Sequence, residues 1–229
     1  MRKYFFVVFL ALLSLPVYAI NLATAIDSIE KEWAEIYYNN TEADPSAAYQ
    51  RLLLKTQSLA EQTPSSPEPL LWEAIIIATD ANHQLPLQAL EQVNRARDLL
   101  QRAIAIDPNG VNGSAQVTLG TLYYMSPPWP IGFGDIKKAE ELFLLALKIN
   151  SESIEANYFY GDFLLSQNRA NLAAPYFKKA LTIPARNHQL FADQNLQQQA
   201  SLALSNANER KINPSKKLFL SLFNDAETH

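Results

Sequence analysis

Apolar positions recur along the second half of the chain with a period that indicates paired helices. Small side chains repeat at 34-residue intervals, from Ala139 to Ala173 and from Ala146 to Ala180. Around them, larger apolar residues stand at three- and four-residue steps, which place them on one face of an α-helix. A fixed period of this length is typical of arrays in which each unit is a helical hairpin. The pattern therefore predicts an all-α chain built from helix pairs.

Two copies of this period can be aligned residue by residue. The first has Leu119, Gly120, Tyr123, Ala139, Phe143 and Ala146, and the second has Tyr160, Gly161, Leu164, Ala173, Phe177 and Ala180. Glycine and alanine let two helices approach closely, and the aromatic side chains fill the remaining space. The two glycines are 41 residues apart, so the first copy has seven additional residues in the turn between its helices.

These residues resemble the tetratricopeptide repeat (TPR) family, whose hairpins combine glycine on the first helix with alanine, an aromatic residue and alanine on the second. A third copy is expected upstream, with a first helix over 69–79 and Ala96, Leu100 and Ala103 on its second helix. The resemblance covers residues 69–184. It implies an α-solenoid of about three repeats over residues 64–188, with lengthened turns near 80–88 and 125–133.

The flanking segments are also predicted to be helical. Residues 20–63 contain an apolar stripe over 21–40 and a helix over 45–62 that begins with Asp44 as N-cap and Pro45 in its first turn. They are a candidate degenerate repeat. Residues 189–229 contain a helix over 189–208 with one narrow apolar stripe, which is what a helix capping the stack requires. A short amphipathic segment over 216–223 follows.

The first 19 residues are predicted to be a signal peptide. Arg2 and Lys3 precede an apolar run over 4–15, Pro16 interrupts that run, and the segment 17–19 offers a small-residue cleavage site. The run is short for a membrane-spanning helix, although an uncleaved anchor is the alternative. We therefore expect a protein exported to the periplasm that meets the membrane only through its cleaved signal sequence.

Composition and charge narrow the functional classes. Lys and Arg number 19 against 23 Asp and Glu, which gives a net charge of −4, so the chain lacks the basic excess of a sequence-independent nucleic-acid binder. The sequence has no cysteine, which excludes disulfides, thiolate metal sites, cysteine nucleophiles and a lipid-bearing cysteine. Glycine is scarce, with 6 residues, in keeping with a helical chain.

No combination of residues points to catalysis. The three histidines, His83, His188 and His229, share no helix face and are predicted to lie in loops. The sequence contains no nucleophile elbow, zinc-protease helix or phosphate-binding loop. We therefore expect a non-enzymatic protein without a cofactor or a metal.

The candidate partner-binding residues come from the repeat pattern. In TPR proteins the first helices of successive repeats line a concave groove, and the resemblance places eight residues there: Ser114, Val117, Thr121, Tyr124, Glu155, Tyr158, Asp162 and Leu165. None is basic, so a clamp for a peptide carboxylate is disfavoured. Tyr124, Glu155, Tyr158 and Asp162 are the candidate contacts with an apolar or basic partner segment or a small solute. The alternative is that Tyr124 and Tyr158 pack on neighbouring helices.

The turn insertion is the second candidate site. It carries Trp129 and Phe133 among three prolines, which stiffen the loop. Such aromatic side chains are either tucked onto the repeat or presented to a partner. We expect them to be tucked, because exposed Trp and Phe side chains reduce solubility.

Short runs give a more distant resemblance. The segments 130–135, 138–140 and 157–161 are similar to exported TPR proteins related to the T-component of tripartite (TRAP) solute transporters. That resemblance implies a periplasmic solute-binding protein as the partner, and a hydrophobic ligand as an alternative function. The leading hypothesis remains a scaffold that binds a protein partner.

Overall fold

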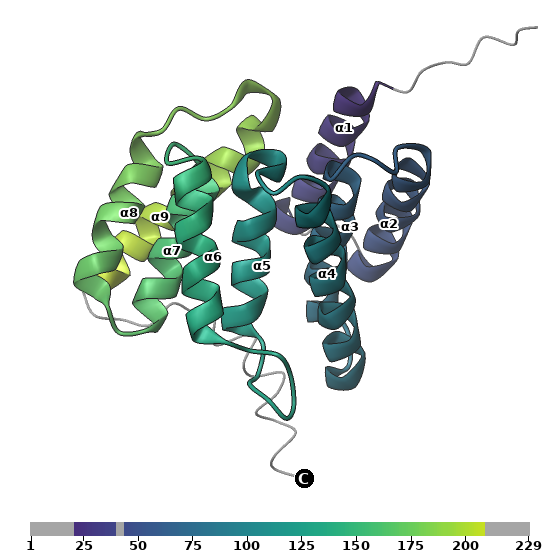
Figure 1. Ribbon diagram of the computed structural model, residues 1–229. Helices are drawn as coiled ribbons and strands as arrows, with labels where there is room; N and C mark the ends of the chain where they lie inside the picture. Colours follow the sequence, from purple (N-terminus) through teal and green to yellow (C-terminus); the bar gives the residue numbers. More distant parts are fainter. Residues whose placement is uncertain (1–20, 40–43, 209–229) are drawn as a thin grey trace, which may run out of the picture.

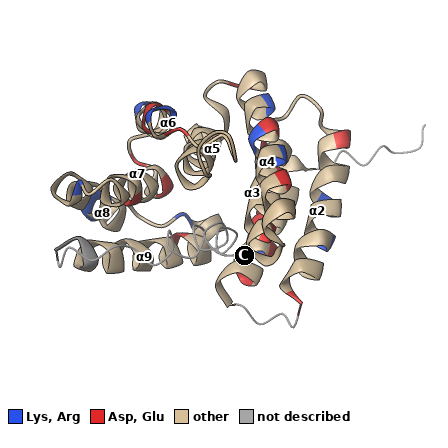
Figure 2. Ribbon diagram, turned by 90° about the horizontal axis from the view of Figure 1, so that it is seen from below, with Lys and Arg blue, Asp and Glu red and all other residues tan. Residues whose placement is uncertain are grey.

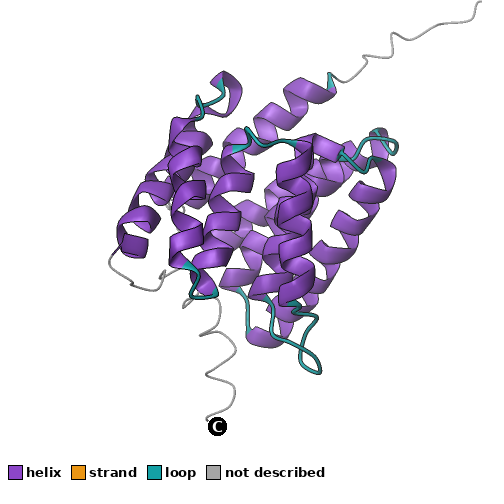
Figure 3. Ribbon diagram, turned by 60° about the vertical axis from the view of Figure 1, so that its left-hand side comes forward, coloured by secondary structure: helices purple, strands orange, loops and turns teal. Residues whose placement is uncertain are grey.

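The computed structural model describes residues 21–39 and 44–208, and this part of the chain consists of helices joined by turns and loops (Figures 1 and 3). The predicted signal peptide, the amphipathic segment over 216–223 and His229 lie outside the described residues. Within them, the one element of β type is an isolated bridge between Pro128 and Gly134. The all-α prediction is confirmed.

The first three helices surround the N-terminal core. Helix α1 spans Leu22–Ala34 and continues as a π-helical turn over Glu35–Asn39. Helices α2 and α3 span Pro45–Gln62 and Glu68–Asp80. The backbone amide of Ala47 donates to the Asp44 carboxylate at 3.0 Å, so Asp44 is the predicted N-cap of α2.

The remaining helices form the repeat array and its C-terminal helix. Their bounds are α4 Pro86–Ile106, α5 Ser114–Met125, α6 Ile136–Ile149, α7 Ile154–Ser166, α8 Ala170–Thr182 and α9 Leu190–Asn208. Short 3₁₀ turns over Ala81–His83, Gly110–Gly113 and Asn187–Gln189 precede α4, α5 and α9. Asp135 caps α6 and Ser153 caps α7 through side-chain oxygens that accept backbone N–H bonds at 3.0 Å.

Three antiparallel hairpins, α3–α4, α5–α6 and α7–α8, make up the array (Figure 1). The alanines and aromatic residues that defined the sequence period are its interior. Eight of them are completely buried: Ala96, Ala103, Ala139, Phe143, Ala146, Ala173, Phe177 and Ala180. The small side chains therefore lie between helices, as TPR-type packing requires.

Gly161 shows how closely the helices of one hairpin approach. A Cβ atom at this position would lie 2.8 Å from Cε1 of Phe177, on the facing helix α8. The Phe177 ring is itself completely buried. Gly120 has the equivalent relation to Phe143, at a looser 3.3 Å. Glycine is thus required at Gly161 by the distance between α7 and α8.

Helix α9 covers the end of the array, as predicted for a capping helix. Its apolar stripe of Leu196, Ala200 and Ala203 is buried against α7 and α8, whereas Gln194 and Gln198 are exposed. Figure 2 shows α9 running alongside these helices toward the N-terminal half of the molecule. There it meets α1, so the two ends of the described chain are in contact.

Candidate functional site

The predicted groove residues lie on the facing sides of α5 and α7. The hydroxyl of Ser114 donates to Glu155 at 2.9 Å, and the Tyr124 hydroxyl donates to the Asp162 carboxylate. These two bonds connect four of the eight predicted residues across α5 and α7. All eight are at least half-buried.

The two groove tyrosines pack inside the protein. Tyr124 and Tyr158 are each 4% exposed. The Tyr124 ring is 5.8 Å from that of Phe163, and the Tyr158 ring is 6.0 Å from that of Phe177. Burial, together with the charge and hydrogen bond of Asp162, raises the pKa of Tyr124 well above its ordinary value. Of the two alternatives for these tyrosines, packing on neighbouring helices is the one observed.

Polar contacts beside α7 join the N-terminal and C-terminal segments. Arg186, in the turn before α9, pairs with Glu155 at 2.8 Å and with Asp193 at 2.7 Å. The side-chain amide of Gln189 donates to the carboxylate of Glu30 on α1. We call these five residues, Glu30, Glu155, Arg186, Gln189 and Asp193, the closure cluster. Beside it, the rings of Tyr38 and Phe191 meet edge to face at 6.0 Å.

The closure cluster contains more carboxylates than cations. Asp193 is 1% exposed and accepts bonds from the backbone amide and the guanidinium of Arg186. Burial lowers the Arg186 pKa, but the bonds and charges of Asp193 and Glu155 outweigh this effect and raise it overall. No sequence motif marked the cluster, because its members come from segments far apart in the chain.

Glu30 is the acid of the closure cluster whose pKa is raised by burial. It is 4% exposed, and the cost of burying its charge raises its pKa from 4.5 to about 8. The nearby negative charges of Glu155 and Asp193 act in the same direction, against the Gln189 hydrogen bond and Arg186. Glu30 is therefore protonated at neutral pH in the folded chain.

The protein is expected to lose stability as the pH rises toward 8, because of Glu30. The unfolded chain ionises this carboxyl near pH 4.5 whereas the folded chain does so near pH 8, so the penalty grows between these values. The full shift corresponds to a penalty on the order of 5 kcal/mol. Urea unfolding at about pH 5 and pH 8 measures it, and Glu30→Gln should flatten the dependence.

A neighbouring carboxyl provides the control for this experiment. Glu32 is on the same helix, but its side chain is 39% exposed and pairs with Lys55. Glu32→Gln should leave the pH dependence of the parent chain unchanged. A Glu30→Gln variant with the same pH slope as the parent would show that Glu30 is not buried against the closure cluster.

The turn insertion between α5 and α6 is a closely bonded loop. The backbone amide of Gly134 donates to Pro127 at 2.8 Å, that of Gly132 to Pro128 at 3.1 Å, and that of Asp135 to Tyr123 at 3.0 Å. A side chain on Gly134 would collide with the carbonyl oxygen of Ser126, so this close approach needs glycine. We call residues 126–135 the Trp129 loop.

The two aromatic residues of the Trp129 loop differ in exposure to solvent. Phe133 is half-buried, with its ring 5.3 Å from that of Tyr123 and 4.7 Å from the guanidinium carbon of Arg97 on α4. Trp129 is 85% exposed and Ile131 is 56% exposed. The expectation that the loop's aromatics are tucked is therefore confirmed for Phe133 and wrong for Trp129. Phe133 thus packs the loop against Tyr123 and Arg97, while the proline-rich tip with Trp129 and Ile131 faces solvent.

The described residues contain neither a metal-binding group nor a membrane-spanning helix. No group of three or more His, Asp or Glu side chains in residues 21–39 and 44–208 is arranged to hold a metal ion. In the same ranges, no helix is both long and apolar enough to span a bilayer.

One family model matches part of the repeat array. Residues 154–187, which contain α7 and α8, match the model of the tetratricopeptide repeat. Two solved structures of MamA resemble the chain. The first is 18% identical in sequence, with a TM-score of 0.42, and the match covers 72% of this chain and 89% of that chain. The second is 16% identical, also with a TM-score of 0.42, and the match covers 82% of this chain and 92% of that chain. No curated protein matches the chain. The protein thus carries a tetratricopeptide repeat at α7–α8, within an all-α fold of TPR-type helix pairs.

Proposed function

We propose that this protein is a non-enzymatic scaffold of the periplasm that binds a protein partner through the Trp129 loop. TPR domains typically mediate contacts between proteins. The observation that carries the proposal is the exposure of Trp129, at 85%, on a loop fixed by its own backbone bonds. An ordered loop loses little conformational entropy on binding, and an exposed Trp contributes large apolar area at an interface.

The burial of the predicted groove moves the binding surface to the outside of the array. Tyr124, Tyr158 and Asp162 are covered, and Glu155 is engaged with Arg186 and Ser114. A partner that reached Glu155 would have to displace its ion pair with Arg186, and one that reached Tyr124 or Tyr158 would have to displace the rings packed against them. Trp129 and Ile131 require no such rearrangement, so they are the contacts we assign to the partner.

Periplasmic location and the nature of the partner rest on the sequence. The signal-peptide pattern over residues 1–19 and the absence of cysteine support export. The resemblance to T-component-like proteins favours a periplasmic solute-binding protein as the partner. The alternative, a hydrophobic ligand held beside Tyr124 and Tyr158, requires space that their ring contacts occupy.

Trp129→Ala should weaken partner binding by about 30-fold, the loss typical of a central interface tryptophan. The melting temperature should stay within error of the parent, because the side chain makes little contact with the fold. The partner is first captured by cross-linking in periplasmic extract and identified. Its affinity for the purified parent and variant chains is then measured by calorimetry.

Leu172→Ala is the matched control. Leu172 is also a large apolar residue, 53% exposed, but it lies on α8, in a different hairpin from the Trp129 loop. This variant should bind as tightly as the parent. Equal affinities of the parent and Trp129→Ala chains would contradict the assignment of the loop as the binding surface.

A further inference from the structure

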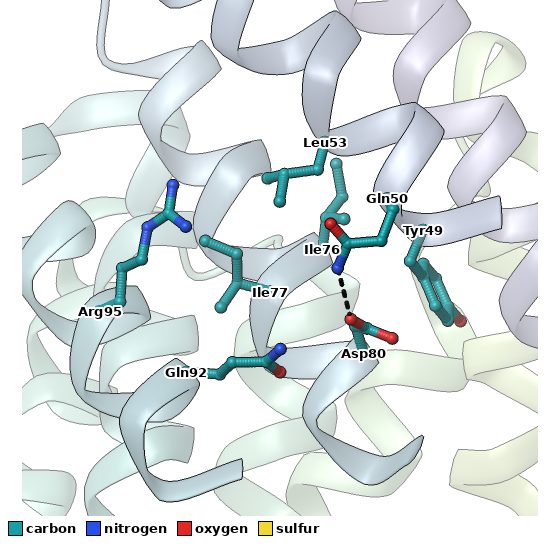
Figure 4. A pocket seen from close by; sticks show the side chains of 8 residues that line it. All are labelled: Tyr49, Gln50, Leu53, Ile76, Ile77, Asp80, Gln92 and Arg95. Carbon is teal, nitrogen blue, oxygen red and sulfur yellow. Dashed lines mark hydrogen bonds between the residues drawn. The ribbon is translucent and has the colours of Figure 1, made fainter. Parts of the chain in front are cut away.

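A small polar cavity lies between α2, α3 and α4, away from the Trp129 loop and the closure cluster. Its volume is about 70 Å³. Figure 4 shows Asp80 and Gln92 facing it from α3 and α4, with Gln50 and Tyr49 on the α2 side. Ile76, Ile77 and Leu53 supply its apolar walls.

The cavity is bordered by two buried oxygen atoms that the described part of the chain leaves without a donor. Asp80 is 2% exposed, and its Oδ2 accepts bonds from the side-chain amides of Gln50 at 3.0 Å and Gln84 at 3.3 Å. Its Oδ1 has no such partner, and neither does Oε1 of Gln92. A buried acceptor without a donor is costly, most of all on a carboxylate. Both oxygens therefore favour an occupant that donates hydrogen bonds.

The charges around the cavity favour a cation. Asp80 is the last residue of α3, so the negative end of the helix dipole adds to its carboxylate. Arg95 also lines the cavity, but its guanidinium pairs with Glu73 at 2.6 Å. No other Lys or Arg side chain lines the cavity. Its local field is thus set by Asp80.

The size of the cavity and the oxygen atoms that line it indicate which kind of cation fits. Magnesium and calcium require about six or more oxygen ligands, commonly from several carboxylates, whereas this cavity offers a single carboxylate. An ammonium group donates N–H bonds in several directions and carries the positive charge that complements a buried carboxylate. We propose that this cavity binds an ammonium group, either as the free ion or as the head of a primary amine such as a lysine side chain of a partner.

The test compares the melting temperature of the full chain in chlorides of ammonium, methylammonium, sodium and tetramethylammonium at equal ionic strength. Ammonium should raise it by about 2–4 °C relative to tetramethylammonium, which has no N–H donor and is too large for the cavity. If methylammonium acts like ammonium, the source includes the head groups of primary amines. If only ammonium acts, the site takes the free ion.

Two variants connect the effect to the cavity. Asp80→Asn preserves the shape of the side chain but removes its charge, and should abolish the difference between the salts. Asp98→Asn, at a carboxylate on α4 that is 61% exposed, should retain it. Gln92→Leu should reduce the effect through the second acceptor, and it keeps the proposal testable if Asp80→Asn fails to fold. Equal melting temperatures of the parent in all four salts would overturn the proposal in favour of ordered water, and a salt effect that survives in Asp80→Asn would overturn it by placing the ion elsewhere.

Discussion

Replacement of Gly161 by valine is expected to lower the free energy of unfolding by about 3 kcal/mol, because it overpacks the contact between α7 and α8. The new Cβ atom would meet the Phe177 ring at 2.8 Å, and the branched side chain would extend farther into it. Phe177 cannot rotate toward solvent, since it is completely buried and lies beside the Tyr158 ring at 6.0 Å. Urea unfolding followed by circular dichroism measures the change.

Ser201→Val separates packing from the intrinsic effect of valine on a helix. Ser201 lies on α9 and is exposed, so valine there adds a branched residue without meeting a neighbour. Its effect should stay within about 0.5 kcal/mol. A Gly161→Val chain that is as stable as the parent would show that α7 and α8 do not approach as closely as the TPR-type packing demands.

Arg186→Met is expected to destabilise the protein by about 3 kcal/mol, because it leaves the acids of the closure cluster without their cation. Methionine preserves much of the aliphatic stem but removes the charge that pairs with Glu155 and Asp193. The Asp193 side chain is only 2% exposed, so water cannot replace the guanidinium. The effect should be concentrated where the cluster joins the two ends of the chain. Hydrogen exchange should accelerate in α1 and α9 more than in α5 and α6.

The control for Arg186 is a cation in an exposed pair. Lys179 contacts Glu152 at 2.6 Å, but the two side chains are 42% and 64% exposed. Such a pair contributes about 0–1 kcal/mol, so Lys179→Met should have little effect. If Arg186→Met and Lys179→Met both lower the free energy of unfolding by less than about 1 kcal/mol, the closure cluster does not hold the two ends of the chain together.

Much of the fold could be predicted because its signals are local or periodic. The alanines at 139, 146, 173 and 180 repeat because each lies at the same helix crossing, and all four are completely buried. The Asp44–Pro45 pair fixed the start of α2 because an N-cap and a proline in the first turn depend on adjacent residues. Even the mutual position of Ser114 and Glu155 followed from the repeat, since equivalent positions face each other.

The closure of the array could not be predicted, because it depends on how repeat curvature accumulates. Glu30 and Gln189 are 159 residues apart, and neither belongs to a motif. Whether α1 and α9 meet is decided by small rotations at every hairpin, which no single residue encodes. The sequence therefore brought Ser114 and Glu155 to equivalent positions of neighbouring repeats but gave no sign that Tyr124 and Tyr158 are covered.

The exposure of the Trp129 side chain was also predicted wrongly. The argument from solubility treated the two aromatic residues of the loop as one group. In the structure, Phe133 finds a place beside Tyr123 and Arg97, and the backbone bonds of Gly132 and Gly134 then direct the loop tip outward. One anchored aromatic residue is thus sufficient to leave the other exposed.

The distance between α1 and α9 tests the central claim most directly, namely that the repeat array closes on itself and leaves its outer surface for binding. The chain has no cysteine, so Ser28→Cys and Gln194→Cys, both at exposed positions, introduce two unique sites for spin labels. Pulsed electron paramagnetic resonance should give one short and narrow distance distribution between them. A long or broad distribution would show that the ends are apart and that the groove around Tyr124 and Tyr158 is open.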